Sequence, residues 1–199
     1  MQDKVIFGID FGSKRSGNTV IAAFKDMRVD FLDTEKGVDA DAFIMNAVEH
    51  YKPDLVFIDA PLSLPGRYSN VSGCECYNFR HADAELKAMS PMFLGGLTAR
   101  AIAIKDACVK KGIEVCETYP KAQATKFNLK KLGYKGNKLA LKLCADTVTE
   151  SIHPNIRLCI KEITTWHHLD ALMALISAMT YAQGHGQVFG KPEEGVIHV

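Results

Sequence analysis

VIFGIDFG, residues 5–12, is the stretch of sequence that decides the fold. Its first six residues form a short apolar run that ends at a carboxylate, Asp10, and a loop rich in glycine and serine follows. Such a run predicts a buried strand. Residues 19–24 and 27–32 have the same character and are joined by a short turn, so we expect three consecutive antiparallel strands.

Helices and further strands alternate after these three strands. Asp39 or Asp41 can cap a helix that carries apolar residues at helical spacing near 43–48. The remaining expected elements are a strand at 55–58 that ends at Asp59, a turn-rich stretch at 61–92 with a helix at 81–89, a helix at 97–110, a strand at 113–116 that ends at Glu117, a helix at 138–149 and a buried helix at 166–182. Residues 184–199 either add a short strand at 195–199 or remain mobile.

The order of these elements resembles that of a ribonuclease-H-type sheet. We therefore expect an α/β fold with a mixed five-stranded sheet, three antiparallel strands followed by parallel ones, flanked by helices. A length of 199 residues fits one domain, 1–199, with a loop insertion at about 61–93.

The composition is that of a globular protein with a substantial core, since 47% of the residues are hydrophobic and 24% are charged. The formal net charge of +1 excludes binding to nucleic acid through bulk charge, so such a partner needs a local basic patch or a metal. No signal sequence is visible, and no stretch approaches the ~18 apolar residues of a membrane span. We expect a soluble, cytoplasmic protein without membrane contact.

Four acidic residues occupy positions that favour chemistry. Asp10, Asp59 and Glu117 end three strands, and Asp170 lies near the start of the apolar helix at 166–182. Ligands of open α/β sheets lie outside the carboxyl ends of the strands, where these side chains can converge. Neighbouring carboxylates repel one another, and a divalent cation removes that cost. Oxygen ligands favour Mg²⁺ or Mn²⁺, and two such ions ~4 Å apart can activate water and stabilise the leaving oxygen of a phosphodiester.

His167 lies three positions before Asp170 on the same helix face. It is therefore a candidate metal ligand, or a candidate general acid or base. Each of these residues also has an ordinary explanation. Asp10 and Asp59 are typical turn formers, Glu117 an exposed strand end, and His167 a structural histidine. Asp170 is the hardest to explain in this way, because its neighbours on the helix are apolar.

These motifs resemble a family of predicted nucleases with the ribonuclease H fold, a domain of unknown function. The resemblance covers about residues 4–182. It rests on four motifs in order, VIFGIDFG (5–12), FIDAPL (57–62), ETYP (117–120) and HHLDAL (167–172), and on an Arg-x-x-Asp motif at Arg80 and Asp83. The last helix is also similar to that of RuvC-type resolvases, with His167 at a position that carries an acid or a histidine there. The resemblance implies that Asp10, Asp59, Glu117 and Asp170 bind the metal.

Several basic residues are candidates for substrate contact. Arginine forks suit phosphate, and Arg80, Asp83, Arg15, Arg67 and Arg100 lie in or beside segments expected near the site. Arg80 and Asp83 can instead pair and brace their loop. Lysines between 121 and 142 form a candidate surface for a nucleic-acid backbone, and a solvated helix face is the ordinary alternative.

The leading hypothesis is a metal-dependent nuclease that acts on DNA or RNA, with branched and single-stranded substrates both open. One alternative is an ATP- or phosphate-binding protein of the actin, Hsp70 and sugar-kinase type, suggested by residues 8–12. That fold needs two such domains, so a homodimer has to compensate. The other alternative is a non-catalytic binding module.

The chain has six cysteines, which we expect to be reduced. Cys108, Cys116, Cys144 and Cys159 fit apolar patterns and are expected in the core. Cys74 and Cys76 lie in a loop shortly before His81. A metal site there is open, although the spacing is not that of a zinc finger.

Overall fold

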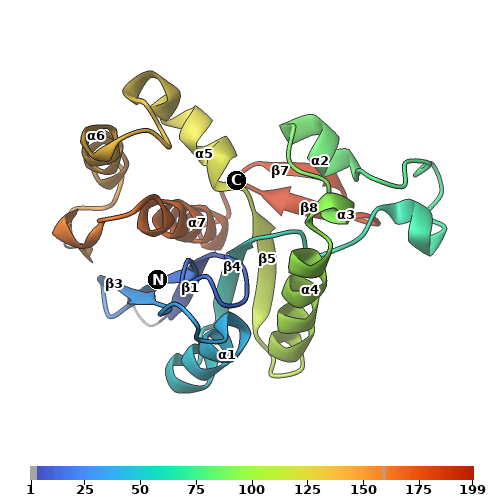
Figure 1. The fold of residues 1–199 in the computed structure, drawn as a ribbon, viewed down its shortest axis with the longest axis horizontal. Coiled ribbons are helices and arrows are strands. Elements are labelled where there is room, and N and C mark those ends of the chain that lie inside the picture. Colours follow the sequence, from blue (N-terminus) through green and yellow to red (C-terminus); the bar gives the residue numbers. More distant parts are fainter. Residues whose placement is uncertain (1–3, 159) are drawn as a thin grey trace.

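A computed structural model describes residues 4–158 and 160–199, and Cys159 lies outside the described residues. The chain has an α/β fold with one mixed β-sheet and helices on both of its faces (Figure 1). The strands are β1 (Ile6–Asp10), β2 (Val20–Lys25), β3 (Arg28–Asp33), β4 (Leu55–Asp59), β5 (Glu114–Thr118), β6 (Arg157–Leu158), β7 (Val188–Lys191) and β8 (Gly195–His198). The longer helices are α1 (Ala40–Tyr51), α4 (Gly96–Val109), α6 (Lys138–Thr149) and α7 (Trp166–Ala182). The shorter ones are η1 (Gly66–Ser69), α2 (His81–Leu86), α3 (Pro91–Leu94), α5 (Pro120–Lys126), η2 (Leu129–Leu132) and η3 (Ile160–Glu162).

The strand order is β6-β3-β2-β1-β4-β5-β8-β7. The three-strand meander is confirmed, because β1, β2 and β3 pair antiparallel and β4 and β5 then add parallel to β1. The expected count of five strands is wrong: the sheet has eight among the described residues. The additional strands are two-residue β6 at one edge and the β7–β8 hairpin at the other, which pairs with β5 over a long sequence separation. Of these, only β8 was an option from the sequence, as the strand at 195–199, because strands this short carry little local pattern.

Two hydrophobic cores lie on the two faces of the sheet. One contains the inner faces of α6 and α7, and the other contains those of α1 and α4 (Figure 1). Helix α7 lies very close to β1, because a Cβ on Gly8 would lie 2.1 Å from the backbone nitrogen of Leu175. Glycine at this position therefore lets α7 pack closely against the sheet, which fixes the distance between the first turns of α7 and the end of β1.

Local signals found the four longer helices and α2, but not the other short ones. Asp39 is the N-cap of α1 and accepts hydrogen bonds from the backbone nitrogens of Asp41 and Ala42 at 3.0 and 3.3 Å. Cys108 and Cys144 are buried and Cys116 is half-buried, which confirms three of the core cysteines. Within the part of the chain that is described, no helix combines the length and apolar character needed to cross a membrane.

Candidate functional site

Three carboxylates meet at the carboxyl end of the sheet, and we call Asp10, Asp59 and Asp170 the acidic edge. Asp10 and Asp59 end β1 and β4 and lie opposite each other in the parallel register. Side chains alternate between the faces of a strand. Ile9 and Ile58 belong to the core under α1 and α4, so the next residues, Asp10 and Asp59, face α7. The first turns of α7 carry Asp170 to the same place.

Asp59 has no hydrogen bond or ion pair to its carboxylate among the described residues. Burial raises its pKa well above the usual range, and the negative charges of Asp10 and Asp170 raise it further. Asp59 also lines a small cavity of about 70 Å³. The acidic edge therefore contains a carboxylate with no hydrogen-bond or ion-pair partner of its own among the described residues, whose negative charge Lys135 offsets only in part and without direct contact.

Asp170 is buried, and both of its oxygens have partners. The Tyr134 hydroxyl donates to Oδ1 at 2.6 Å, and the Lys135 ammonium contacts Oδ2. Burial nevertheless raises the pKa of Asp170 to about 6, with Asp10 adding to the rise and Lys135 opposing it. Lys135 comes from the loop before α6 and its side chain is half-exposed, at 49%. It is the one lysine or arginine that forms an ion pair with the acidic edge within the described ranges.

His167 binds Asp10, with Nδ1 lying 2.7 Å from Oδ2. The hydrogen bond to Asp10 raises the pKa of His167, although partial burial opposes the rise. Its side chain is 38% exposed, and Nε2 has no partner in the described part of the chain. His168 is turned away and buried against Thr165 and Asp33.

Glu117 lies one residue before the end of β5 but does not join the acidic edge. It pairs in register with Ile58, so its side chain leaves the opposite face of the sheet from Asp10 and Asp59. There the Arg80 guanidinium donates to both oxygens, at 2.6 Å each, and the Leu62 backbone nitrogen donates at 2.8 Å. The Glu117 carboxylate is therefore already paired with Arg80, which it shares with Asp83, whereas a fourth metal ligand needs a free carboxylate.

Arg80 and Asp83 are almost completely buried, each with 1% of its surface exposed. The Arg80 guanidinium bonds Asp83 through Nε and Nη2 and donates to Ser63 Oγ at 2.8 Å, besides its contacts with Glu117. This pairing matches the alternative in which the two residues brace their loop. Two carboxylates hold the arginine inside, where it braces the insertion against the end of β5.

The other arginines expected near the site are on the surface. Arg67 is exposed and donates to the Tyr77 hydroxyl at 3.2 Å, on the insertion. Arg15 is exposed in the loop after β1, and its side chain makes no described contact. Arg100, also expected beside the site, is less exposed: it binds both oxygens of Asp41 and donates to the Gly12 carbonyl at 3.2 Å. That contact ties α4 to the loop that follows Asp10.

The ligand atoms of the acidic edge are not yet gathered around one point. Among the described residues, the single set of three histidine, cysteine or carboxylate groups whose ligand atoms lie within 4.8 Å of one another is Cys74, His81 and Glu194. That set is outside the acidic edge. A metal held by Asp10, Asp59 and Asp170 therefore requires their side chains to rotate inward and Lys135 to move aside.

No family model and no curated protein matches this sequence. Family membership therefore stays a prediction from the motifs. Among solved structures, the chain is similar to one described as T. thermophilus RuvC in complex with Holliday junction substrate, with 14% identity and a TM-score of 0.46. The alignment covers 91% of this chain and 96% of that one. A function has to be inferred from the side chains of the acidic edge themselves.

Proposed function

We propose that the protein is a metal-dependent nuclease of the ribonuclease H type, in which Asp10, Asp59 and Asp170 bind Mg²⁺ or Mn²⁺. The proposal treats the chain as one domain with an insertion at about 61–93. The observation that carries it is the Asp59 carboxylate, which faces two other acids and has no protein cation or donor of its own among the described residues. Structural carboxylates are normally paired, so this one is more typical of a site built for a ligand.

The chemistry of the donors fits a hard divalent ion. All three groups offer carboxylate oxygens, which Mg²⁺ and Mn²⁺ prefer. A divalent ion removes the repulsion that now raises the pKa of Asp59. Lys135 already neutralises Asp170 from an exposed loop, so it marks a position for positive charge and can leave without disturbing the core. We do not carry Glu117 into the ligand set, because Arg80 holds it.

A bound metal supplies an activated water and stabilises charge on the phosphate. Asp10 holds His167 through Nδ1, which fixes the orientation of the ring and favours its protonated form. Nε2 of His167 is then left to give a proton to a leaving oxygen or to take one from water. This is the role in phosphodiester hydrolysis that we assign to His167.

The proposed substrate is nucleic acid, held by the basic segment at 121–142. Lys130, Lys131 and Lys138 are exposed and form no ion pair with the described residues. Lys135, in the same segment, contacts Asp170 and so places this basic surface beside the acidic edge. Because the net charge is only +1, this local segment supplies the attraction to phosphates.

The test combines Mn²⁺ titration with cleavage assays on labelled branched DNA, single-stranded DNA and RNA. We expect Asp59→Asn to abolish both Mn²⁺ binding and Mg²⁺-dependent cleavage, because it removes the carboxylate that no described protein cation contacts directly. Asp106→Asn is the matched control, since Asp106 is exposed on α4 without a described side-chain partner. Wild-type and Asp59→Asn proteins that bind Mn²⁺ equally well would refute the proposal.

A non-catalytic binding module is the second candidate. It is favoured by the charge pairing of Asp170 with Lys135 and of Glu117 with Arg80, which leaves fewer free carboxylates than a preformed metal site has. Nucleic-acid binding that persists in EDTA and in Asp59→Asn, without cleavage of any substrate, would select this alternative. Binding or hydrolysis of ATP with intact nucleic acids would instead favour the actin-like hypothesis.

A further inference from the structure

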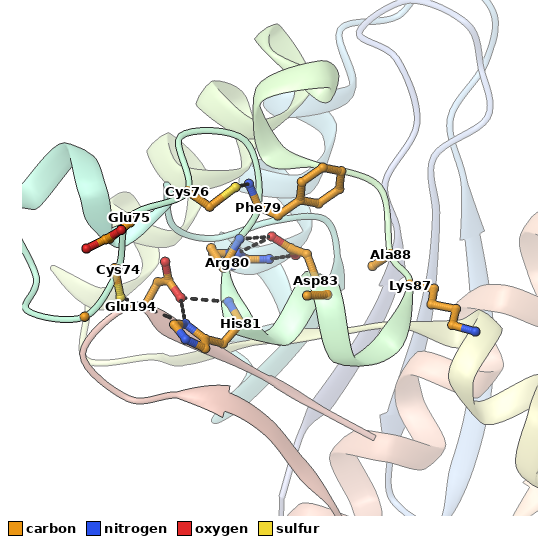
Figure 2. Close-up of a pocket in the computed structure, with 12 residues that line it drawn as sticks. Cys74, Glu75, Cys76, Phe79, Arg80, His81, Asp83, Lys87, Ala88 and Glu194 are labelled. Atoms are coloured by element: carbon orange, nitrogen blue, oxygen red, sulfur yellow. Dashed lines mark hydrogen bonds and ion pairs between the residues drawn. The ribbon is translucent and has the colours of Figure 1, made fainter.

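A second group of metal-ligating side chains lies where the insertion meets the C-terminal hairpin (Figure 2). Cys74 follows η1, His81 begins α2, and Glu194 lies in the turn between β7 and β8. Figure 2 shows the three side chains turned toward one another. Segments separated by more than a hundred residues thus bring three different ligand types to one point.

The distances are close to those of a metal site. His81 Nδ1 lies 2.7 Å from Glu194 Oε2 and 3.9 Å from Cys74 Sγ. Ligands of a tetrahedral zinc ion with ordinary bond lengths lie about 3.4 Å apart for nitrogen and oxygen and about 3.6 Å for nitrogen and sulfur. An ion can therefore enter when these atoms shift by less than about 1 Å.

Glu194 is held ready by the surrounding backbone. It is 4% exposed, its Oε1 accepts from the Gly66 nitrogen at 2.7 Å, and its Oε2 accepts from the His81 nitrogen at 2.7 Å. The Ser63 hydroxyl donates to the Glu194 carbonyl at 2.8 Å. Hydrogen bonds of this kind orient ligands in metal sites and strengthen binding.

The arrangement differs from that of a nucleophile activated by a base. In such a triad the cysteine and the acid contact opposite nitrogens of the histidine ring. Here both Cys74 and Glu194 converge on Nδ1 of His81. Convergence on one atom is what a shared cation produces, whereas a proton relay through the ring needs both nitrogens.

We propose that Cys74, His81 and Glu194 bind one Zn²⁺ ion, with a fourth position open to the neighbouring cavity. A thiolate and an imidazole select zinc or cobalt over magnesium, so this site is chemically distinct from the acidic edge. All three residues line a cavity of about 650 Å³, which leaves room for water or a small ligand at the fourth position. The ion ties the β7–β8 hairpin to the insertion.

The test uses the full-length protein, stripped of metal and titrated with Co²⁺ as a spectroscopic substitute for Zn²⁺. We expect one Co²⁺ per chain, with thiolate charge-transfer absorption and intense tetrahedral d–d bands that Zn²⁺ displaces. His81→Gln should weaken binding more than about tenfold, and Cys74→Ser should remove the charge-transfer band. The matched controls His185→Gln and Cys76→Ser should retain wild-type spectra, since His185 is exposed elsewhere and Cys76 lies outside the three-ligand set.

His81 is partly exposed, so His81→Gln is expected to fold, and far-ultraviolet circular dichroism checks this. Co²⁺ binding without a thiolate band, or a band that survives Cys74→Ser and disappears in Cys76→Ser, would overturn the ligand set. Unchanged affinity in folded His81→Gln would overturn the site and leave only a hydrogen-bonded cluster. Asp59→Asn should keep the cobalt spectrum, which separates this inference from the proposed nuclease.

Discussion

Asp170→Asn should stabilise the metal-free protein at alkaline pH while removing a ligand of the proposed metal. The pKa of Asp170 rises from 3.8 to about 6 because the carboxyl group is buried. The folded state therefore keeps the proton to higher pH than the unfolded state does. As the pH rises from 3.8 to about 6, ionisation of Asp170 therefore lowers the free energy of unfolding. The full loss of stability is present above about pH 6.

The size of the effect can be worked from the shift. A change of about two pH units corresponds to about 3 kcal/mol at 1.36 kcal/mol per unit. Only 4% of the Asp170 side chain is exposed, so solvent screening reduces this value little. The contact with Lys135 is already included, since it opposes the shift. At pH 4 the unfolded carboxyl is already about half ionised, so compared with wild type Asp170→Asn should gain about 2.5 kcal/mol more at pH 8 than at pH 4.

Urea denaturation in EDTA at both pH values measures this difference. Comparing the two pH values cancels any change in hydrogen bonding that asparagine introduces at all pH values, and Asp106→Asn corrects for the loss of a surface charge. Mn²⁺ at about 1,000 times its Kd should reverse the order, because it stabilises wild type by about 4.1 kcal/mol. An equal stability difference at pH 4 and pH 8 would refute the reasoning, since Lys135 would then compensate fully for burial.

Three further predictions test the site and its support. Lys135→Ala should tighten Mn²⁺ binding in calorimetry, because the ammonium no longer competes for its carboxylate; weaker binding would contradict the displacement of this lysine. Arg80→Leu should lower the free energy of unfolding by about 3–5 kcal/mol, since it leaves two buried carboxylates unpaired, whereas exposed Arg67→Leu should change it by less than about 1 kcal/mol. In the same urea assay, Gly8→Ala should lower the free energy of unfolding several times more than Gly96→Ala does. A Cβ at position 8 overlaps the α7 backbone, whereas a Cβ at position 96 meets nothing within 4 Å.

Local patterns were sufficient for most of the elements. The meander, the parallel strands at 55–59 and 114–118 and the buried helix at 166–182 are all predictable from short apolar runs, caps and turns. Only the second strand of the hairpin at 188–198 was predicted, at 195–199 and as one of two options, because these glycine-rich strands carry weak patterns and are stabilised by pairing with β5 and contact with α2.

The two faces of β5 explain why Glu117 does not lie with Asp10, Asp59 and Asp170, where it was expected from the sequence. A strand buried on both sides has no alternation of polar and apolar residues, so its sequence does not reveal which face Glu117 uses. The register with β4 decides this, and it places Glu117 beside Arg80 on the face away from α7. Likewise, nothing local pairs Lys135 with Asp170 across 35 positions.

The sequence alone therefore determined where the strands end and that Asp10, Asp59 and Asp170 lie at one end of the fold, since strand and helix periods are local properties. Only the tertiary structure decided which carboxylates face one another and which are neutralised by a basic side chain. Facing and pairing depend on register and on contacts between distant segments, and the free energy of a buried charge is set by those neighbours.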